Sequence, residues 1–303
     1  MSTPRTIFAM LAVTFAVVSA HAASIYVVNY SNQFGTVDVS TGHFTPISSI
    51  DPTATGGGLL GLVSGPSGSL LSMDFNGNLD AIRPSTGALS PIGSTGLGIN
   101  AFALGSFGSQ IFATAYSNKL YRVNPTTGHA TLVGPTGIPS DHEYPFTVNP
   151  DGSIELCDES LTDVNGVLYA TYDEFAVGSD GHTINPPGDP SNAPALYRID
   201  PSTGKATFIA PTSGQITSTF SSDGNLYGFR GNLNSPNSYI DPAGSINKID
   251  VSTGALTLVS SVDDFGGGIP GAVAAPTPEP SPLVLLASGL FGGAAYLRRA
   301  RSH

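Results

Sequence analysis

A concentration of carboxylates without neighbouring cations is the feature of this sequence with the clearest chemical potential. Eleven of the 22 acidic residues lie between positions 141 and 189, and no Lys or Arg occurs between Arg122 and Arg198. Carboxylates that converge without basic partners repel one another, and a divalent cation relieves this repulsion. Ca²⁺ takes about six to eight oxygen ligands and tolerates flexible sites. The candidate calcium ligands are Asp158, Glu159, Asp163, Asp173 and Glu174.

Two interpretations of this acidic region stay open from the sequence. The first is a calcium site made by the five candidates. The second is a solvated acidic loop, because the sequence has neither EF-hand spacing nor a nonapeptide Gly-Asp repeat. His142, beside Asp141 and Glu143, is a further candidate metal ligand.

Other catalytic signatures are missing from the sequence. It contains neither a Gly-x-Ser-x-Gly elbow nor a His-Glu-x-x-His motif. Paired carboxylates are abundant, but the sequence does not give the separation that glycoside hydrolysis needs. Cys157 is the only cysteine, so no intramolecular disulfide can form, and we interpret it as a buried, inert thiol. The sequence therefore favours a non-enzymatic protein without deciding the question.

The elements that must position these acids are repeats. The segment "LYRIDPSTGKATFI" (Leu196 to Ile209) closely matches "LYRVNPTTGHATLV" (Leu120 to Val133), and three further copies align with them. Self-similarity of this kind indicates a repeat architecture. The five copies share a Thr-Gly pair, which ends at Gly42, Gly87, Gly128, Gly204 and Gly254.

Each copy predicts a β-hairpin. Apolar residues alternate on both sides of the Asp-Pro-Ser-Thr-Gly turn, with the two-residue period of a strand. Within the turn, Asp200 can bond the backbone downstream, Pro201 presets φ, and Gly204 can take a positive φ. The pattern survives when Asp200 becomes Arg83 in another copy, so we interpret this stretch as scaffold rather than as a functional motif.

Further strand-like segments precede each hairpin and complete a unit of about four strands. Such units at this period indicate an all-β protein, namely a β-propeller of five four-stranded blades, with six blades as the alternative. The expected domain covers residues 23–275 and carries an acidic insertion near 141–195. We expect a strand near Ile269–Ala274 to pair beside Ile25–Val28 and close the ring, because closure removes open sheet edges. The repeat resembles propeller units of the NHL and YWTD type in a general way.

The N-terminus predicts a secretory signal peptide over residues 1–22. Arg5 is its only charge, an apolar run follows from Ile7 to Val18, and the segment ends with Ala20-His21-Ala22. A basic start, an apolar centre and a small-x-small end define such a peptide. We expect cleavage after Ala22, with Ala20 and Ala22 as the recognition residues.

The C-terminal segment 276–303 combines a Pro-Glu-Pro triplet, a short apolar stretch rich in glycine and a terminal arginine cluster. This combination resembles the PEP-CTERM sorting domain of Gram-negative bacteria. The resemblance implies export, transient anchoring in the inner membrane, processing by an exosortase-type enzyme, and association with extracellular polysaccharide or the cell surface. A permanent single-pass anchor is the alternative. The motif residues are Pro278, Glu279, Pro280, Arg298, Arg299 and Arg301.

The net charge of −11 argues against nucleic acid as a partner, because phosphate neutralisation needs a basic surface. We therefore expect an exported propeller that acts as a cell-surface or matrix binding module, with extracellular polysaccharide or a surface protein as partner. The alternative is a calcium-dependent propeller hydrolase of lactonase or glycosidase type. The only cofactor that the sequence suggests is Ca²⁺.

Overall fold

A computed structural model describes residues 24–98, 101–115, 118–138, 154–177, 183–184, 194–231, 243–262 and 269–275. The expected signal peptide and the sorting tail lie outside these ranges, and so do Asp141, His142 and Glu143. Among the residues that the structure describes, no helix has the length and apolar character needed to cross a membrane.

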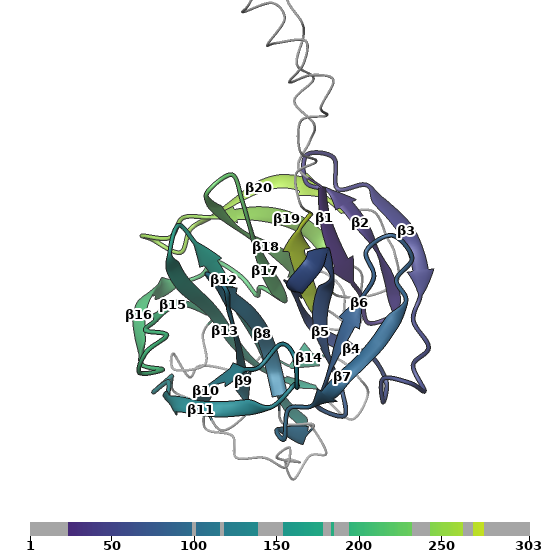
Figure 1. Ribbon diagram of the computed structural model, residues 1–303. Coiled ribbons are helices and arrows are strands. Elements are labelled where there is room, and N and C mark those ends of the chain that lie inside the picture. Colours follow the sequence, from purple (N-terminus) through teal and green to yellow (C-terminus); the bar gives the residue numbers. More distant parts are fainter. Residues whose placement is uncertain are drawn as a thin grey trace, which may run out of the picture.

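Five antiparallel sheets stand as blades around a common centre (Figure 1). From the centre outward, blade 1 contains β21 (Gly271–Ala274), β1 (Ser24–Val28), β2 (Gln33–Asp38) and β3 (Phe44–Ser49). In the same direction, blade 2 contains β4 (Leu59–Ser64), β5 (Leu70–Asp74), β6 (Asn78–Ile82) and β7 (Leu89–Ser94), with the short 3-10 turn η1 (Pro66–Gly68) between β4 and β5.

The remaining three blades repeat this order. Blade 3 contains β8 (Ala101–Phe107), β9 (Gln110–Ala115), β10 (Lys119–Val123) and β11 (Ala130–Pro135). Blade 4 contains β12 (Ile154–Val164), β13 (Val167–Val177), β15 (Ala195–Ile199) and β16 (Ala206–Pro211), and β14 (Thr183–Ile184) pairs with β13. Blade 5 contains β17 (Ser218–Ser222), β18 (Asn225–Gly231), β19 (Ala243–Ile249) and β20 (Leu256–Ser261).

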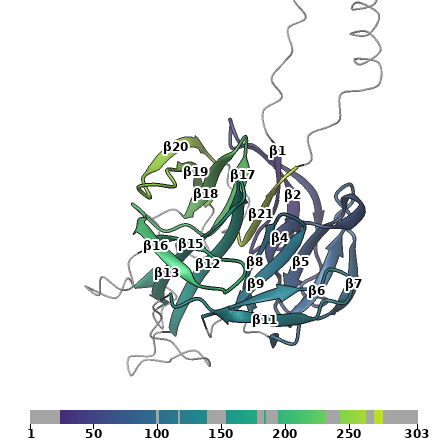
Figure 2. The same cartoon turned by 60° about the vertical axis from the view of Figure 1, so that its left-hand side comes forward.

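The ring closes as the sequence predicts. Strand β21 is the inner strand of blade 1, and it pairs antiparallel with β1, with Val27 opposite Ala272 and Val28 opposite Gly271. Figure 2 shows the yellow β21 beside the purple β1, although the two strands come from opposite ends of the domain. The last strand therefore covers the edge that β1 would otherwise expose.

The core consists of five separate layers, one between each pair of neighbouring blades. The layer between blades 5 and 1 contains Ile25 and Phe229, and the next layer, between blades 1 and 2, contains Phe34 and Leu70. Similar clusters fill the other three interfaces. Both faces of each blade are thus buried against neighbouring blades. A single blade could not bury its apolar faces without the rest of the ring.

The Thr-Gly turns form as predicted and have a second role that the sequence did not reveal. In the turn of blade 4, the Gly204 amide donates to the Asp200 carbonyl at 2.8 Å, and Gly204 has a φ of +81°. A Cβ atom at Gly204 would lie 2.7 Å from the Gly134 carbonyl oxygen on the outer strand of blade 3. The glycine therefore also permits close approach of the preceding blade.

The inner strand β12 of blade 4 lies within the stretch that the sequence predicts as an acidic insertion. It runs over Ile154–Val164. Strand β13 pairs with β12 along its whole length. Much of the expected acidic insertion is therefore the extended inner hairpin of a blade, rather than an element outside the repeat.

Candidate functional site

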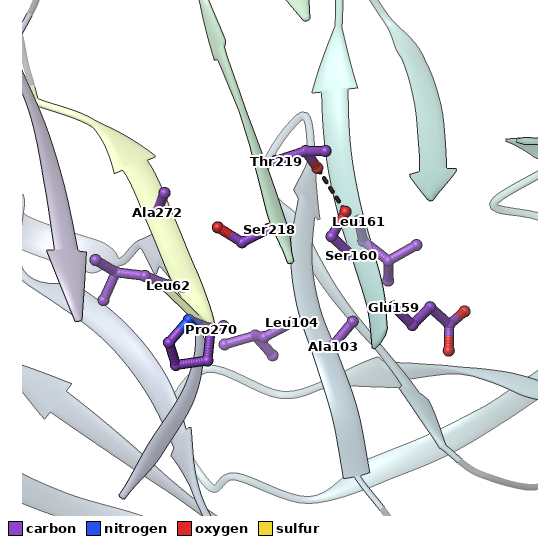
Figure 3. Close-up of a pocket in the computed structure, with 12 residues that line it drawn as sticks. Leu62, Ala103, Leu104, Glu159, Ser160, Leu161, Ser218, Thr219, Pro270 and Ala272 are labelled. Carbon is purple, nitrogen blue, oxygen red and sulfur yellow. Dashed lines mark hydrogen bonds between the residues drawn. The ribbon is translucent and has the colours of Figure 1, made fainter. Parts of the chain in front are cut away.

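The candidate site is the centre of the ring, where residues on or beside all five inner strands line one pocket (Figure 3). Leu62, Leu104 and Ala272 supply apolar groups from blades 2, 3 and 1, while blades 4 and 5 supply polar ones. The cavity volume is about 10 Å³, which is roughly the room that one water molecule needs. The pocket in this central channel is therefore far too small for a saccharide.

A chain of buried hydroxyl groups joins blades 4 and 5 beside this pocket. The Ser160 hydroxyl lies 2.6 Å from that of Thr171 and 2.8 Å from that of Thr219, and the Thr162 hydroxyl lies 2.7 Å from that of Thr219. Figure 3 shows the contact between Ser160 and Thr219 across the two inner strands. The chain holds neighbouring blades together in a low-dielectric setting, where hydrogen bonds are strong.

Ser218 also lines the channel, on the strand that carries Thr219. Its side chain is buried, and its hydroxyl has no hydrogen-bond partner among the described residues. A hydroxyl becomes a good nucleophile only beside a base. The hydroxyl chain includes no such base among the described residues, and its members bond one another.

Glu159 is the acidic residue at the pocket wall. Burial raises the pKa of its carboxyl group to about 7, and the nearby Thr114 hydroxyl offsets part of that rise. A carboxyl group with such a pKa suits general acid–base chemistry. In Figure 3, however, the carboxylate points away from the pocket centre, on the far side of β12 from Ser218. Glu159 therefore reaches the interface with blade 3 and not the channel.

The predicted calcium ligands are distributed along the β12–β13 hairpin. The register places Asp158 opposite Asp173 and Cys157 opposite Glu174. The side chains of Asp158, Cys157 and Glu174 lie outside the described part of the structure. Like charges directly opposite one another destabilise a sheet unless a proton or a cation compensates them. The Asp158–Asp173 pairing is thus the part of the predicted site that the fold brings together.

Asp163 does not join that pair. It lies five residues further along β12, and its carboxylate accepts hydrogen bonds from the backbone amides of Gly166 at 2.8 Å and Gly108 at 3.1 Å. These contacts fix the β12–β13 turn and attach it to blade 3. Within the described ranges, no group of three or more His, Cys, Asp or Glu side chains could hold a metal ion. The calcium site therefore stays a prediction.

Sequence reasoning missed a buried acidic pair in blade 2. Asp74 accepts hydrogen bonds from the Asn78 backbone amide at 2.7 Å and from its side-chain amide at 2.9 Å. Asp80 is 6% exposed, and its pKa is raised to about 6, first by burial and second by the negative charge of Asp74. The signal was present in the alternation of β6, which places Asp80 in the same row as the buried Ile82.

Asp80 makes folding stability depend on pH. Its folded pKa lies above the ordinary value of 3.8, so the folded state holds a proton more tightly than the unfolded chain. Stability therefore falls as the pH rises from about 4 to about 6, and the loss is complete above that range. We expect Asp80→Asn to stabilise the protein by about 1 kcal/mol more at pH 8 than at pH 5, allowing for solvent screening.

Urea unfolding at the two pH values measures this difference. Asp51→Asn is the control, because hydrogen bonds from Thr53 lower the pKa of exposed Asp51. Its contribution is present above pH 4 and is constant between pH 5 and pH 8. An equal effect of Asp80→Asn at both pH values would show that Asp80 titrates normally.

The sheets, their order and the closing strand define the class of the protein, which is a five-bladed β-propeller with four-stranded blades. No protein-family model matches the chain, and the search of curated proteins found no significant match.

Two solved structures are similar to the chain in fold. One is a streptogramin B lyase structure with 12% identity and a TM-score of 0.37, for which the match covers 86% of this chain and 68% of that chain. The other is the computationally designed Ika8 protein with 13% identity and a TM-score of 0.32, covering 83% of this chain and 65% of that chain. Neither likeness says anything about activity.

Proposed function

We propose that the protein is an exported β-propeller that is sorted through a PEP-CTERM tail and acts as a binding module at the cell surface or in the extracellular matrix. The observation that carries this proposal is the position of the two ends of the described domain. The Ala275 amide donates to the Ser24 carbonyl at 3.0 Å, and Ser24 pairs with Asp38 at the start of a Thr-Gly turn. A leader and a tail can therefore attach at one end of the ring without disturbing it.

The character of the channel supports binding rather than catalysis. Its hydroxyls bond one another across blades 4 and 5, and the carboxylate of Glu159 points away from them. A rigid closed ring of this kind presents fixed surfaces, and preorganisation favours affinity. Extracellular polysaccharide is the partner that the sorting tail implies, with a surface protein as the alternative and the inner membrane as a transient site of attachment.

A calcium-dependent hydrolase of lactonase or glycosidase type is the second candidate. The pairing of Asp158 with Asp173 favours it, together with the raised pKa of Glu159 nearby. Calorimetric titration of the protein with CaCl₂ decides between the two functions. Binding that is abolished by Asp173→Asn would favour the hydrolase, and the absence of any heat of binding would remove it.

Fractionation of cells that produce the full chain tests the proposed sorting. We expect wild-type protein in the surface and extracellular fractions, because the tail would be recognised and removed by an exosortase-type enzyme. Glu279→Ala is expected to leave the protein in the inner-membrane fraction. Asp223→Asn, at an exposed turn of the propeller, is the control and should be sorted normally, because Asn tolerates the positive φ of +49° at that position. Wild-type protein in the cytosolic fraction would contradict the proposal.

A further inference from the structure

An open hollow lies at the Thr-Gly turn of blade 3. The acidic hairpin of blade 4 approaches its edge at Asp163, whose carboxylate accepts a hydrogen bond from the Gly108 amide at 3.1 Å. The hollow has about 980 Å³ of empty space, counting the solvent at its mouth. Its wall comes from the start of β9, the end of β10, the turn between β10 and β11, and β11 itself. The residues that carry the argument are Gln110, Arg122, Asn124, His129 and Thr131.

The hollow is basic in an otherwise acidic protein. It is lined by Arg122 and His129 but by no Asp or Glu, whereas the whole chain has a net charge of −11. Both side chains are exposed, and neither makes an ion pair with any residue that the structure describes. An unpaired guanidinium group that projects into a hollow is a donor available to a ligand, and its fork matches carboxylate or sulfate oxygens.

Comparison of the five turns shows that blades 2 and 3 lack the negative charge at the first position of the turn, where blade 2 has Arg83 and blade 3 has Asn124. Blades 1, 4 and 5 have an Asp at the first position of the turn, where its carboxylate accepts backbone amide hydrogen bonds. Blade 3 has Asn124 there, and its side-chain oxygen accepts the same bonds from Thr126 at 2.8 Å and Thr127 at 3.2 Å. The turn is thus preserved while the negative charge is removed.

The missing negative charge matters because a cation, Arg122, lies two residues before the first position of this turn in the sequence. In blade 4 the equivalent Arg198 lies beside the charged cap Asp200, and in blade 5 Lys248 lies beside Asp250. Blades 1 and 2 have no cation at this position. Blade 2 carries its cation at the cap itself, whereas blade 3 combines a strand cation with an uncharged cap, so no acid of its own turn offsets the charge of Arg122.

We infer that this hollow is a binding site for an anionic polysaccharide, with Arg122 holding a carboxylate or sulfate group. The amides of Gln110 and Asn124 and the hydroxyl of Thr131 provide neutral donors and acceptors that suit sugar hydroxyls. This inference rests on the proposed binding function and names its ligand class and its site. An anionic lipid surface offers oxygens to the same guanidinium group and is the main competing partner, so the test includes it.

Calorimetric titration of the full chain, purified in a non-ionic detergent, with a size-defined oligogalacturonate tests the site. Neutral malto-oligosaccharide of equal length is the ligand control. We expect binding of the acidic oligosaccharide only, with affinity that falls as salt is added. Arg122→Gln should weaken binding about tenfold or more, because a hydrogen bond between two charged groups is lost.

Asn124→Asp is the sharper variant, because blades 1, 4 and 5 show that Asp supports the same turn. It should leave the melting temperature unchanged and weaken oligogalacturonate binding severalfold. Arg198→Gln removes the same charge at the equivalent position of blade 4 and should leave affinity unchanged. Equal affinity in all three variants would overturn the site.

Two further outcomes would overturn the ligand class. One is Arg122-dependent binding to vesicles of phosphatidylglycerol without binding to oligogalacturonate. The other is co-sedimentation of the full chain with the extracellular polysaccharide of the producing cells without any binding of the acidic oligosaccharide. With this second outcome, the proposed function would stand, and only the inference about blade 3 would fail.

Discussion

A chain that ends at Val262 is expected not to form a stable monomeric propeller. It lacks β21, whose residues pair with β1, and it loses Ile269 from the apolar layer between blades 5 and 1. Ile269 is fully buried, and loss of one such side chain costs about 2–5 kcal/mol. Because domains are stable by only about 5–15 kcal/mol, the further loss of an inner strand should abolish cooperative unfolding.

The matched control is a chain that ends at Ala275. It keeps β21 and the hydrogen bond from the Ala275 amide to the Ser24 carbonyl, so we expect it to fold and remain monomeric. Circular dichroism during thermal unfolding, together with size-exclusion chromatography, distinguishes the two chains. If the shorter chain melted cooperatively at the same temperature as the longer one, ring closure would not be required for stability.

The second large effect concerns the Thr-Gly turns. Gly128 has a φ of +79°, and a Cβ atom there would lie 2.3 Å from the Gly93 carbonyl oxygen on the outer strand of blade 2. Alanine at this position is strained by its backbone conformation and also collides with backbone atoms that belong to a neighbouring blade. We expect Gly128→Ala to lower the free energy of unfolding by about 2–4 kcal/mol.

Gly166→Ala separates the two causes. Gly166 has a φ of +77°, but a Cβ atom there would have no neighbour within 4 Å. Only the backbone strain applies, which is about 1–2 kcal/mol. Urea unfolding measures both variants. Equal losses in the two proteins would mean that the Thr-Gly glycine serves its own turn and not the contact between blades.

The repeat explains why so much of the fold could be predicted from the sequence. Each hairpin is defined locally by alternating apolar residues and by turn residues, and five copies corroborate one another. Ring closure was also predictable, because the first unit lacks an inner strand and the segment near Ile269 has no other partner. The hairpins follow from residues that are close in the sequence, and ring closure follows from the number of strand segments. The sequence provides both directly.

What the sequence could not provide is the detailed register and burial of individual residues within the blades. The pairing of the outer strand in every blade contains a β-bulge, for example between the pairs Leu120–Gly134 and Tyr121–Leu132, and no residue pattern announced it. Asp80 seemed an ordinary strand residue until its burial against Asp74 was visible. Nothing in the sequence favoured any of the five candidate calcium ligands over the others. The strand register, however, pairs Asp158 with Asp173 and places Asp163 elsewhere.

The blade 3 hollow illustrates a third situation. The aligned copies show that Asn124 stands where three other copies have Asp. Its effect on the local charge, however, depends on Arg122 and His129 lining the same hollow. Alignment alone interprets such positions as tolerant surface sites. Only the arrangement of Arg122, Asn124 and His129 around the hollow makes one basic surface of them.

The central claim, that this propeller is displayed outside the cell after sorting through its tail, is tested most directly by the intact mass of the protein recovered from the surface and extracellular fractions. We predict a mass that lacks residues 1–22 and also lacks Arg298 to Arg301. A recovered protein that retains Met1, or a mature extracellular form that still carries the arginine cluster, would contradict the claim.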